Sequence, residues 1–246
     1  MKRKIALILS VIMVFSISMT TFAFASSSPT KIIYASSNLS GTKGAKSIPS
    51  IQGEAQMVDK FQLYEATTKE GTYKLVKTIN AEDAYGDTKY FTYHGTKTSG
   101  MHFFKARSIT GNEQGEFSDP VAVYSCAGKY VSKKKDSKTG KYIYKYQINN
   151  TGKSTLKMTV KAGKRYDYNT REAVNVDMLN KNGKKINKVT ISKNSKKYLY
   201  LRDVKMSNKN IYGCFLVDIN YKGEVQHFTI GLYKNSFYMN NYNYGT

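Results

Sequence analysis

Residues 211–233 read IYGCFLVDINYKGEVQHFTIGLY and have the pattern of a β-hairpin. Two runs rich in aromatic and β-branched residues flank the dipeptide Lys222-Gly223, and glycine suits the positive φ of a two-residue turn. A turn at this point pairs Tyr221 with Glu224 and sets the register of every pair behind it. The segment therefore predicts two antiparallel strands joined by a tight turn.

This register gives the hairpin two unlike faces. One face pairs Val217 with Phe228 and Phe215 with Ile230, and the other pairs Asp218 with His227 and Cys214 with Gly231. Because the apolar pairs recur along the hairpin, one face is expected to lie on a hydrophobic core.

The same two-residue alternation recurs through the chain. Residues 155–162, TLKMTVKA, alternate apolar with polar side chains, and residues 173–179, AVNVDML, repeat the pattern. Further strands are expected at 60–79 (two strands), 101–109, 121–125, 127–132, 141–148, 184–191 and 196–204. Short strands separated by turn residues, with no sustained helical period, predict an all-β chain of two consecutive β-sandwich domains.

The first half contains FQLYEATTKEGTYKLVKTI (61–79) and HFFKARSITGNEQGEFSDPVAV (102–123). These stretches resemble bacterial fibronectin type III domains, and the resemblance covers about residues 29–125. It implies a sandwich that serves as a spacer or binding platform. Two features depart from the family pattern: the chain has no tryptophan, and His102 stands where the corner tyrosine is expected.

The second half contains YQINNTGKSTLKMTVKAGKRYDY (146–168), which resembles the opening strands of Ig-like modules, including a proteinase-inhibitor type. The resemblance implies an Ig-like sandwich of about seven strands over residues 126–234. An inhibitor role does not follow from it, because these residues are common to many sandwiches.

The first 25 residues, MKRKIALILSVIMVFSISMTTFAFA, have the pattern of a secretory signal peptide. A basic start precedes an apolar run, and Ala23-Phe24-Ala25 is a cleavage site of the A-x-A type. We therefore expect a secreted protein that is either released or held at the cell wall without a covalent link, with no transmembrane segment in the mature chain. The fibronectin-like domain is expected at 26–125, and residues 235–246 are expected to be an Asn/Tyr-rich tail that is mobile or adhesive.

Charge is divided unequally between the two halves. Residues 26–125 hold eleven basic and ten acidic residues, a net of +1, whereas residues 126–246 hold twenty-five and seven, a net of +18. Such an excess predicts an anionic partner for the second half.

The run at 133–135 is expected in the connection between two strands, and the other candidate cations are spread over the second half. The candidate polyanion-binding residues are Lys133, Lys134, Lys135, Lys157, Lys161, Lys184, Lys185, Lys196, Lys197 and Arg202. Twenty-two of the twenty-five cations are lysines, which act as point charges and suit diffuse binding. Teichoic acid, acidic polysaccharide and nucleic-acid backbone fit, and tyrosines such as Tyr198 and Tyr200 can add stacking. The alternative is an extracellular protein partner, with the lysines serving solubility.

Cys126 and Cys214 are candidates for a disulfide in an exported protein; the alternative is one buried and one exposed thiol. Cys214, Asp218 and His227 are the one suggestive catalytic set, but the hairpin register separates the thiol from the imidazole by roughly 13 Å. A nucleophile and its base must approach to about 3 Å. We expect an ordinary Asp218–His227 pair, no enzyme activity, no metal site and no cofactor.

Overall fold

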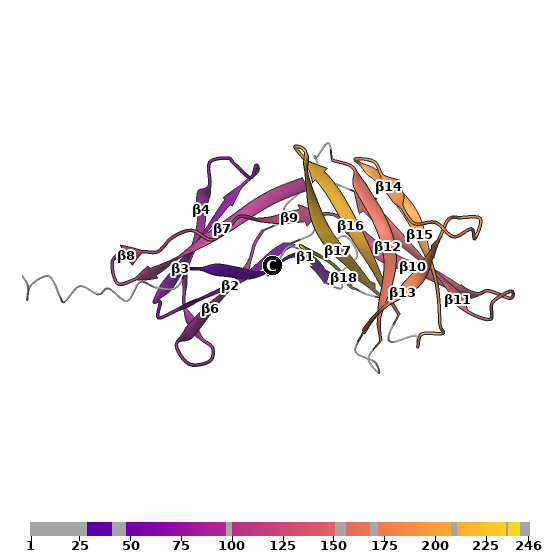
Figure 1. Ribbon diagram of the computed structural model, residues 1–246, viewed down its shortest axis with the longest axis horizontal. Helices are drawn as coiled ribbons and strands as arrows, with labels where there is room; N and C mark the ends of the chain where they lie inside the picture. The colour runs from indigo at the N-terminus through magenta and orange to yellow at the C-terminus, as the bar shows by residue number, and fades with distance from the viewer. Residues whose placement is uncertain are drawn as a thin grey trace, which may run out of the picture.

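The structure is a computed structural model that describes residues 29–40, 48–96, 100–150, 156–167, 172–207, 211–234 and 236–241. The expected signal peptide at 1–25 lies outside the described residues. Every regular element in the described part is a β-strand, so the all-β expectation is confirmed. Figure 1 shows an elongated molecule in which two β-sandwiches lie end to end.

The first sandwich has two facing sheets. One sheet contains, in order, β1 (Lys31–Ser40), β2 (Ile48–Gln56), β6 (Thr88–His94) and β5 (Glu82–Asp83). The other contains, in order, β4 (Lys74–Asn80), β3 (Lys60–Ala66), β7 (Gly100–Thr110) and β8 (Glu113–Gln114), with β9 (Val121–Ser125) also paired to β7. Its strands therefore match those expected at 60–79, 101–109 and 121–125.

Alternate side chains of these strands form the first core. Phe61 and Leu63 of β3 face Phe91 of β6 and Ile51 of β2, and all four are fully buried. The rings of Phe61 and Phe91 lie 4.8 Å apart, centroid to centroid. This two-residue alternation is the feature that made the strands recognisable in the sequence.

The second sandwich holds the remaining strands. One layer contains β10 (Ala127–Lys135), β11 (Tyr142–Asn150) and β15 (Ser195–Asp203), in that order. The other contains β13 (Glu172–Leu179), β12 (Met158–Asp167), β16 (Tyr212–Tyr221), β17 (Glu224–Tyr233) and β18 (Ser236–Asn241), with β14 (Val189–Ile191) also paired to β12. Because β13 also pairs with β15, the two layers are joined along one edge.

The β16–β17 hairpin has the predicted register, from Tyr221 opposite Glu224 to Cys214 opposite Gly231. Both turn residues have positive φ, 49° at Lys222 and 93° at Gly223. The tight turn predicted from this dipeptide is therefore confirmed.

Several strand predictions in the second half are wrong in their limits. The lysines at 133–135 lie in β10 and pair with residues of β11, so the connection is only 136–141. A bulge at Val131 shifts the register of β10 by one residue, but it does not end the strand. Backbone pairing with β11 continues beyond it to Lys135. The segment 184–191 is a strand only at its end, in β14.

Residues 236–241 are not a tail. They form β18, which pairs with β17 on one side and with β1 on the other. Phe237 and Met239 are buried in the second core, and this burial fixes the strand. Figure 1 shows β18 beside β1 at the junction of the two sandwiches. One hydrogen-bonded sheet therefore runs from the second sandwich into the first.

The junction between the sandwiches is also part of a shared core. Met101 and Phe103 of β7 and Ala122 and Tyr124 of β9 belong to the same buried cluster as the core of the second sandwich. The Asn241 side-chain amide donates a hydrogen bond to the Ala122 carbonyl at 2.8 Å. The first sandwich keeps a core of its own, but the opposite side of β7 and β9 is buried in the second core. The two domains that the sequence pattern predicted are therefore joined by buried packing.

Candidate polyanion-binding face

The outer face of β10, β11 and β15 is organised in cross-strand rows. The strand registers set these rows as Ala127–Asn149–Lys196, Lys129–Gln147–Tyr198, Ser132–Lys145–Tyr200 and Lys134–Ile143–Arg202. The neighbouring residues of β11 and β15, including Tyr146 and Leu199, point into the core. The four rows contain no acidic residue. We refer to these twelve residues as the basic–aromatic face.

Lysine and tyrosine are in direct contact on this face. The Lys145 ammonium lies 4.0 Å from the ring centroid of Tyr198 and 5.9 Å from that of Tyr200. Tyr198 is 45% exposed. The aromatic rings attract the ammonium through their negative faces, so the cation is held beside an accessible ring.

The sequence-predicted cations do not form one patch. Lys134, Lys196 and Arg202 lie on the basic–aromatic face, whereas Lys133, Lys135 and Lys197 are on the alternate positions of the same strands. Lys157 and Lys161 belong to the β12 layer, and Lys184 and Lys185 lie in the connection from β13 to β14. The set is therefore divided among three regions of the second sandwich.

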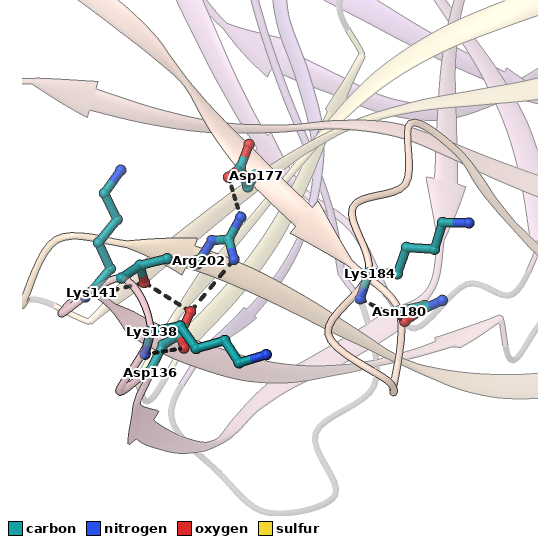
Figure 2. Close-up of polar contacts among 8 residues, drawn as sticks. Asp136, Lys138, Lys141, Asp177, Asn180, Lys184 and Arg202 are labelled. Atoms are coloured by element: carbon teal, nitrogen blue, oxygen red, sulfur yellow. Dashed lines mark hydrogen bonds and ion pairs between the residues drawn. The ribbon is translucent and has the colours of Figure 1, made fainter.

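Several of the predicted cations are in ion pairs. Figure 2 shows the Arg202 guanidinium between two carboxylates, 2.9 Å from Asp177 Oδ2 and 3.5 Å from Asp136 Oδ2. The Lys185 ammonium lies 2.7 Å from Asp177 Oδ1. Lys161 pairs with Asp218 on the other layer. These side chains serve local charge balance, in contrast to the expectation that they are available to a polyanion.

The Arg202 network also shifts the ionisation of its acids. Hydrogen bonds from Lys185 and then from Arg202 hold the pKa of Asp177 below its ordinary value. The Thr139 hydroxyl, with smaller contributions from the Lys138 backbone amide and Arg202, lowers the pKa of Asp136. The network therefore ties the 136–141 turn to β15 and β13 while the carboxylates are charged (Figure 2).

The suggestive catalytic set is not assembled around a nucleophile. The imidazole Nδ1 of His227 lies 2.9 Å from Asp218 Oδ1, as expected for a cross-strand pair. Cys214 is opposite Gly231, four positions along the hairpin from the Asp218–His227 pair. Burial alone would raise the pKa of Asp218, but hydrogen bonds from Lys161 and His227 outweigh it and hold that pKa low.

The two cysteines are both buried, and they are not joined by a disulfide. The reason is that they lie on opposite sides of the sheet. Cys126 faces the second core with its sulfur 3.5 Å from the Met239 sulfur, whereas Cys214 adjoins core-facing Phe215 and so points to the outer side. Neither the disulfide nor the alternative of one exposed thiol is found. Burial raises the pKa of the Cys126 thiol.

Sequence reasoning missed Lys129 and Lys145 as members of the site. The signal for Lys145 was present in KYIYKYQI (141–148), where it alternates with two tyrosines that the pleat sends to the other face. It also missed a cation–aromatic cluster on the outer face of β3 and β7. There Phe117 lies between two cations, 4.1 Å from the Lys105 ammonium and 4.9 Å from the Arg107 guanidinium carbon.

The described ranges contain neither a metal-binding cluster nor a membrane-spanning helix. Within them, His, Cys, Asp and Glu form no group of three or more arranged to hold a metal ion. In the same ranges there is no helix with the length and apolarity needed to cross a membrane.

No protein-family model matches the chain, and no curated protein matches its sequence. Among solved structures, the chain is similar to the crystal structure of the FN1–FN3 domains of chicken CNTN1, with 9% identity and a TM-score of 0.21. The match covers 74% of this chain and 62% of that one, so the chain spans less than two thirds of its length.

Proposed function

We propose that this chain is an exported, non-catalytic binding protein whose second sandwich holds an anionic cell-wall or matrix polymer. The observation that carries the proposal is the set of lysines left without an anionic partner. In the described part of the chain, Lys134, Lys135, Lys184, Lys196 and Lys197 are exposed and form no ion pair.

The charge balance of the second half supports this function. A net charge of +18 over residues 126–246 makes the folded sandwich repel itself, and an anionic polymer would relieve that repulsion. Lysines bind as hydrated point charges and need no fixed geometry in the partner. Binding of this kind weakens as salt rises.

The first sandwich acts in this proposal as a platform. Its arrangement, with β1, β2 and β6 facing β3, β4, β7 and β9, is consistent with the fibronectin type III resemblance of residues 29–125. The shared core and the β1–β18 pairing hold the platform to the basic sandwich. The signal-peptide pattern of residues 1–25 supports export.

The test uses the whole mature chain, because dividing it between the sandwiches would cut the shared core. The test variant replaces four lysines of the second sandwich together by glutamine: Lys134, Lys135, Lys196 and Lys197. The matched control replaces four exposed lysines of the first sandwich: Lys31, Lys60, Lys74 and Lys77. Both variants lose the same charge. Retention on immobilised polygalacturonate, polyphosphate and isolated cell walls is then measured across a salt gradient.

We expect the first variant to bind about tenfold or more weakly at low salt, since surface ion contacts are worth roughly 0.2–1 kcal/mol each. The control should behave as the unmodified protein does. Equal loss in the two variants would contradict a site on the second sandwich. A partner retained regardless of salt would favour the alternative of a protein interface.

A further inference from the structure

We propose that the basic–aromatic face is a binding site for an acidic polysaccharide, with Tyr198 as the stacking platform for a sugar ring. This inference rests on the proposed function and adds the location of the site and the chemical class of its ligand. It starts from the contact between the Lys145 ammonium and the Tyr198 ring at 4.0 Å.

The pleat of the sheet sets the spacing of the groups on this face. Lys129 and Tyr198 lie in one row across three strands, so their backbones are about 10 Å apart. Lys196 and Tyr200 are each two residues from Tyr198 along β15, or roughly 7 Å. A polymer lying over Tyr198 therefore meets a cation on more than one side of the ring.

The electrostatics of the face favour an anionic ligand. Its four rows hold lysine at Lys129, Lys134, Lys145 and Lys196 and no acid. Two acids border the end of the face, Asp136 and Asp177, and both are already paired with Arg202 (Figure 2). Three of these lysines, at 129, 134 and 196, are exposed.

The exposed ring of Tyr198 favours a ligand that has a surface for stacking as well as negative charge. The apolar face of a tyrosine ring can stack on the C–H groups of a sugar or on a base, whereas phosphate has no such surface. Single-stranded nucleic acids use successive aromatic platforms along a groove. Of the two tyrosines on this face, Tyr198 is 45% exposed, whereas Tyr200 is half-buried. One ring surrounded by lysines fits a charged sugar chain better than a run of stacked bases.

The experiment measures binding of three probes at low salt: oligogalacturonate of fixed length, inorganic polyphosphate of matched charge, and oligothymidylate. The variants are Tyr198→Ala, Tyr198→Phe and Lys145→Gln in the full mature chain. Tyr85→Ala is the control, because Tyr85 is 93% exposed and lies in the first sandwich. Thermal unfolding of each variant checks that the fold is retained.

We expect Tyr198→Ala to weaken oligogalacturonate binding about tenfold, the effect of losing one stacked ring, and to leave polyphosphate binding unchanged. Tyr198→Phe should bind nearly as the unmodified protein does, since the ring remains. Lys145→Gln should weaken both of these probes.

Four results would overturn the inference. Oligogalacturonate binding that is unaffected by Tyr198→Ala, or an equal loss for oligogalacturonate and polyphosphate, would remove the stacking role. A larger Tyr198→Ala effect on oligothymidylate would assign the face to single-stranded nucleic acid. If the unmodified protein binds none of the three probes, the proposed function fails together with the inference, whereas failure of the Tyr198 variants alone leaves the proposed function standing.

Discussion

The rings of Phe103 and Tyr221 lie 5.0 Å apart, centroid to centroid, and they come from different sandwiches. Phe103 is on β7 of the first, and Tyr221 ends β16 of the second. Beside them the Tyr124 hydroxyl donates a hydrogen bond to Asn150, and the Lys69 ammonium lies 2.6 Å from Glu224. The junction thus combines aromatic contacts with a buried hydrogen bond and, at its margin, an exposed ion pair.

The first prediction is that the two sandwiches unfold together. Phe103→Ala removes a ring that is 1% exposed, which should lower the free energy of unfolding by about 3–5 kcal/mol. Because Phe103 packs into the second core, one transition should shift as a whole in denaturant, followed by fluorescence and circular dichroism. Tyr85→Ala, at an exposed position, should have little effect. Two separate transitions, with only the first displaced, would contradict the shared core.

The second prediction concerns β18. Deleting residues 236–246 removes Phe237 and Met239 from the core and leaves β17 and β1 with unpaired edges. Exposed edges pair with other chains, so the truncated protein should self-associate in sedimentation experiments. Phe237→Ala keeps the backbone pairing, and it should be destabilised by about 3–5 kcal/mol yet remain monomeric. A monomeric truncated protein would show that the pairing of β18 with its neighbours is dispensable.

Local pattern explains how much of this fold was predictable. The hairpin at 211–233 was correct pair by pair because its turn dipeptide and its alternation agree. The strand β18 was missed because its sequence, SFYMNN, is rich in polar residues. One of its two partner strands, β1, also lies some two hundred residues away. No local signal reports such a partner.

The candidate site was only partly predictable for a related reason. Net charge identified the basic half, but a lysine count does not show which lysines are neutralised. Arg202 and Lys185 are paired through Asp177, whereas Lys134 and Lys196 form no ion pair with any residue that the structure describes. The side of the sheet on which Cys126 lies depends on the junction with β18, which the sequence pattern does not indicate.

The third prediction concerns the thiols. Because Cys126 and Cys214 are 1% and 8% exposed and lie on opposite sides of the sheet, the native protein should react slowly with a thiol reagent. Both thiols should react at once in denaturant without prior reduction. The intact mass should not change on reduction. A mass increase of two hydrogens on reduction would demonstrate a disulfide and contradict this arrangement.

The fourth prediction is a dependence of stability on acid. The folded-state pKa of Asp177 is lowered by Lys185 and Arg202, so the unfolded chain binds its proton first as pH falls. The stabilisation is therefore present above the unfolded pKa of about 4 and is lost as pH drops through the lower folded pKa. As the pH is lowered from neutral to acid, the midpoint of urea unfolding should fall less steeply for Asp177→Asn than for the unmodified protein. Parallel curves would mean that the ion pairs of Asp177 do not contribute.

The last prediction isolates backbone conformation at the hairpin turn. Gly223 has a φ of 93°, and a Cβ placed there would meet no atom within 4 Å, so Gly223→Ala introduces strain without a clash. The cost should be about 1–2 kcal/mol in the free energy of unfolding.

Lys222 also has a positive φ, of 49°, but a substitution there should raise the free energy of unfolding. Asparagine adopts this conformation several times more readily than lysine, so Lys222→Asn should stabilise by roughly 0.5 kcal/mol.

Gly231→Ala is the contrasting variant at the other end of the hairpin. A Cβ at Gly231 would collide with the Tyr238 ring of β18, so its cost comes from displacing that ring. Gly223→Ala should therefore change stability without altering the reactivity of Cys214, whereas Gly231→Ala should expose that thiol because it lies opposite Gly231. If Gly223→Ala left the denaturant midpoint unchanged, the turn would have to adopt another conformation. The register of the hairpin would then depend on its apolar pairs alone.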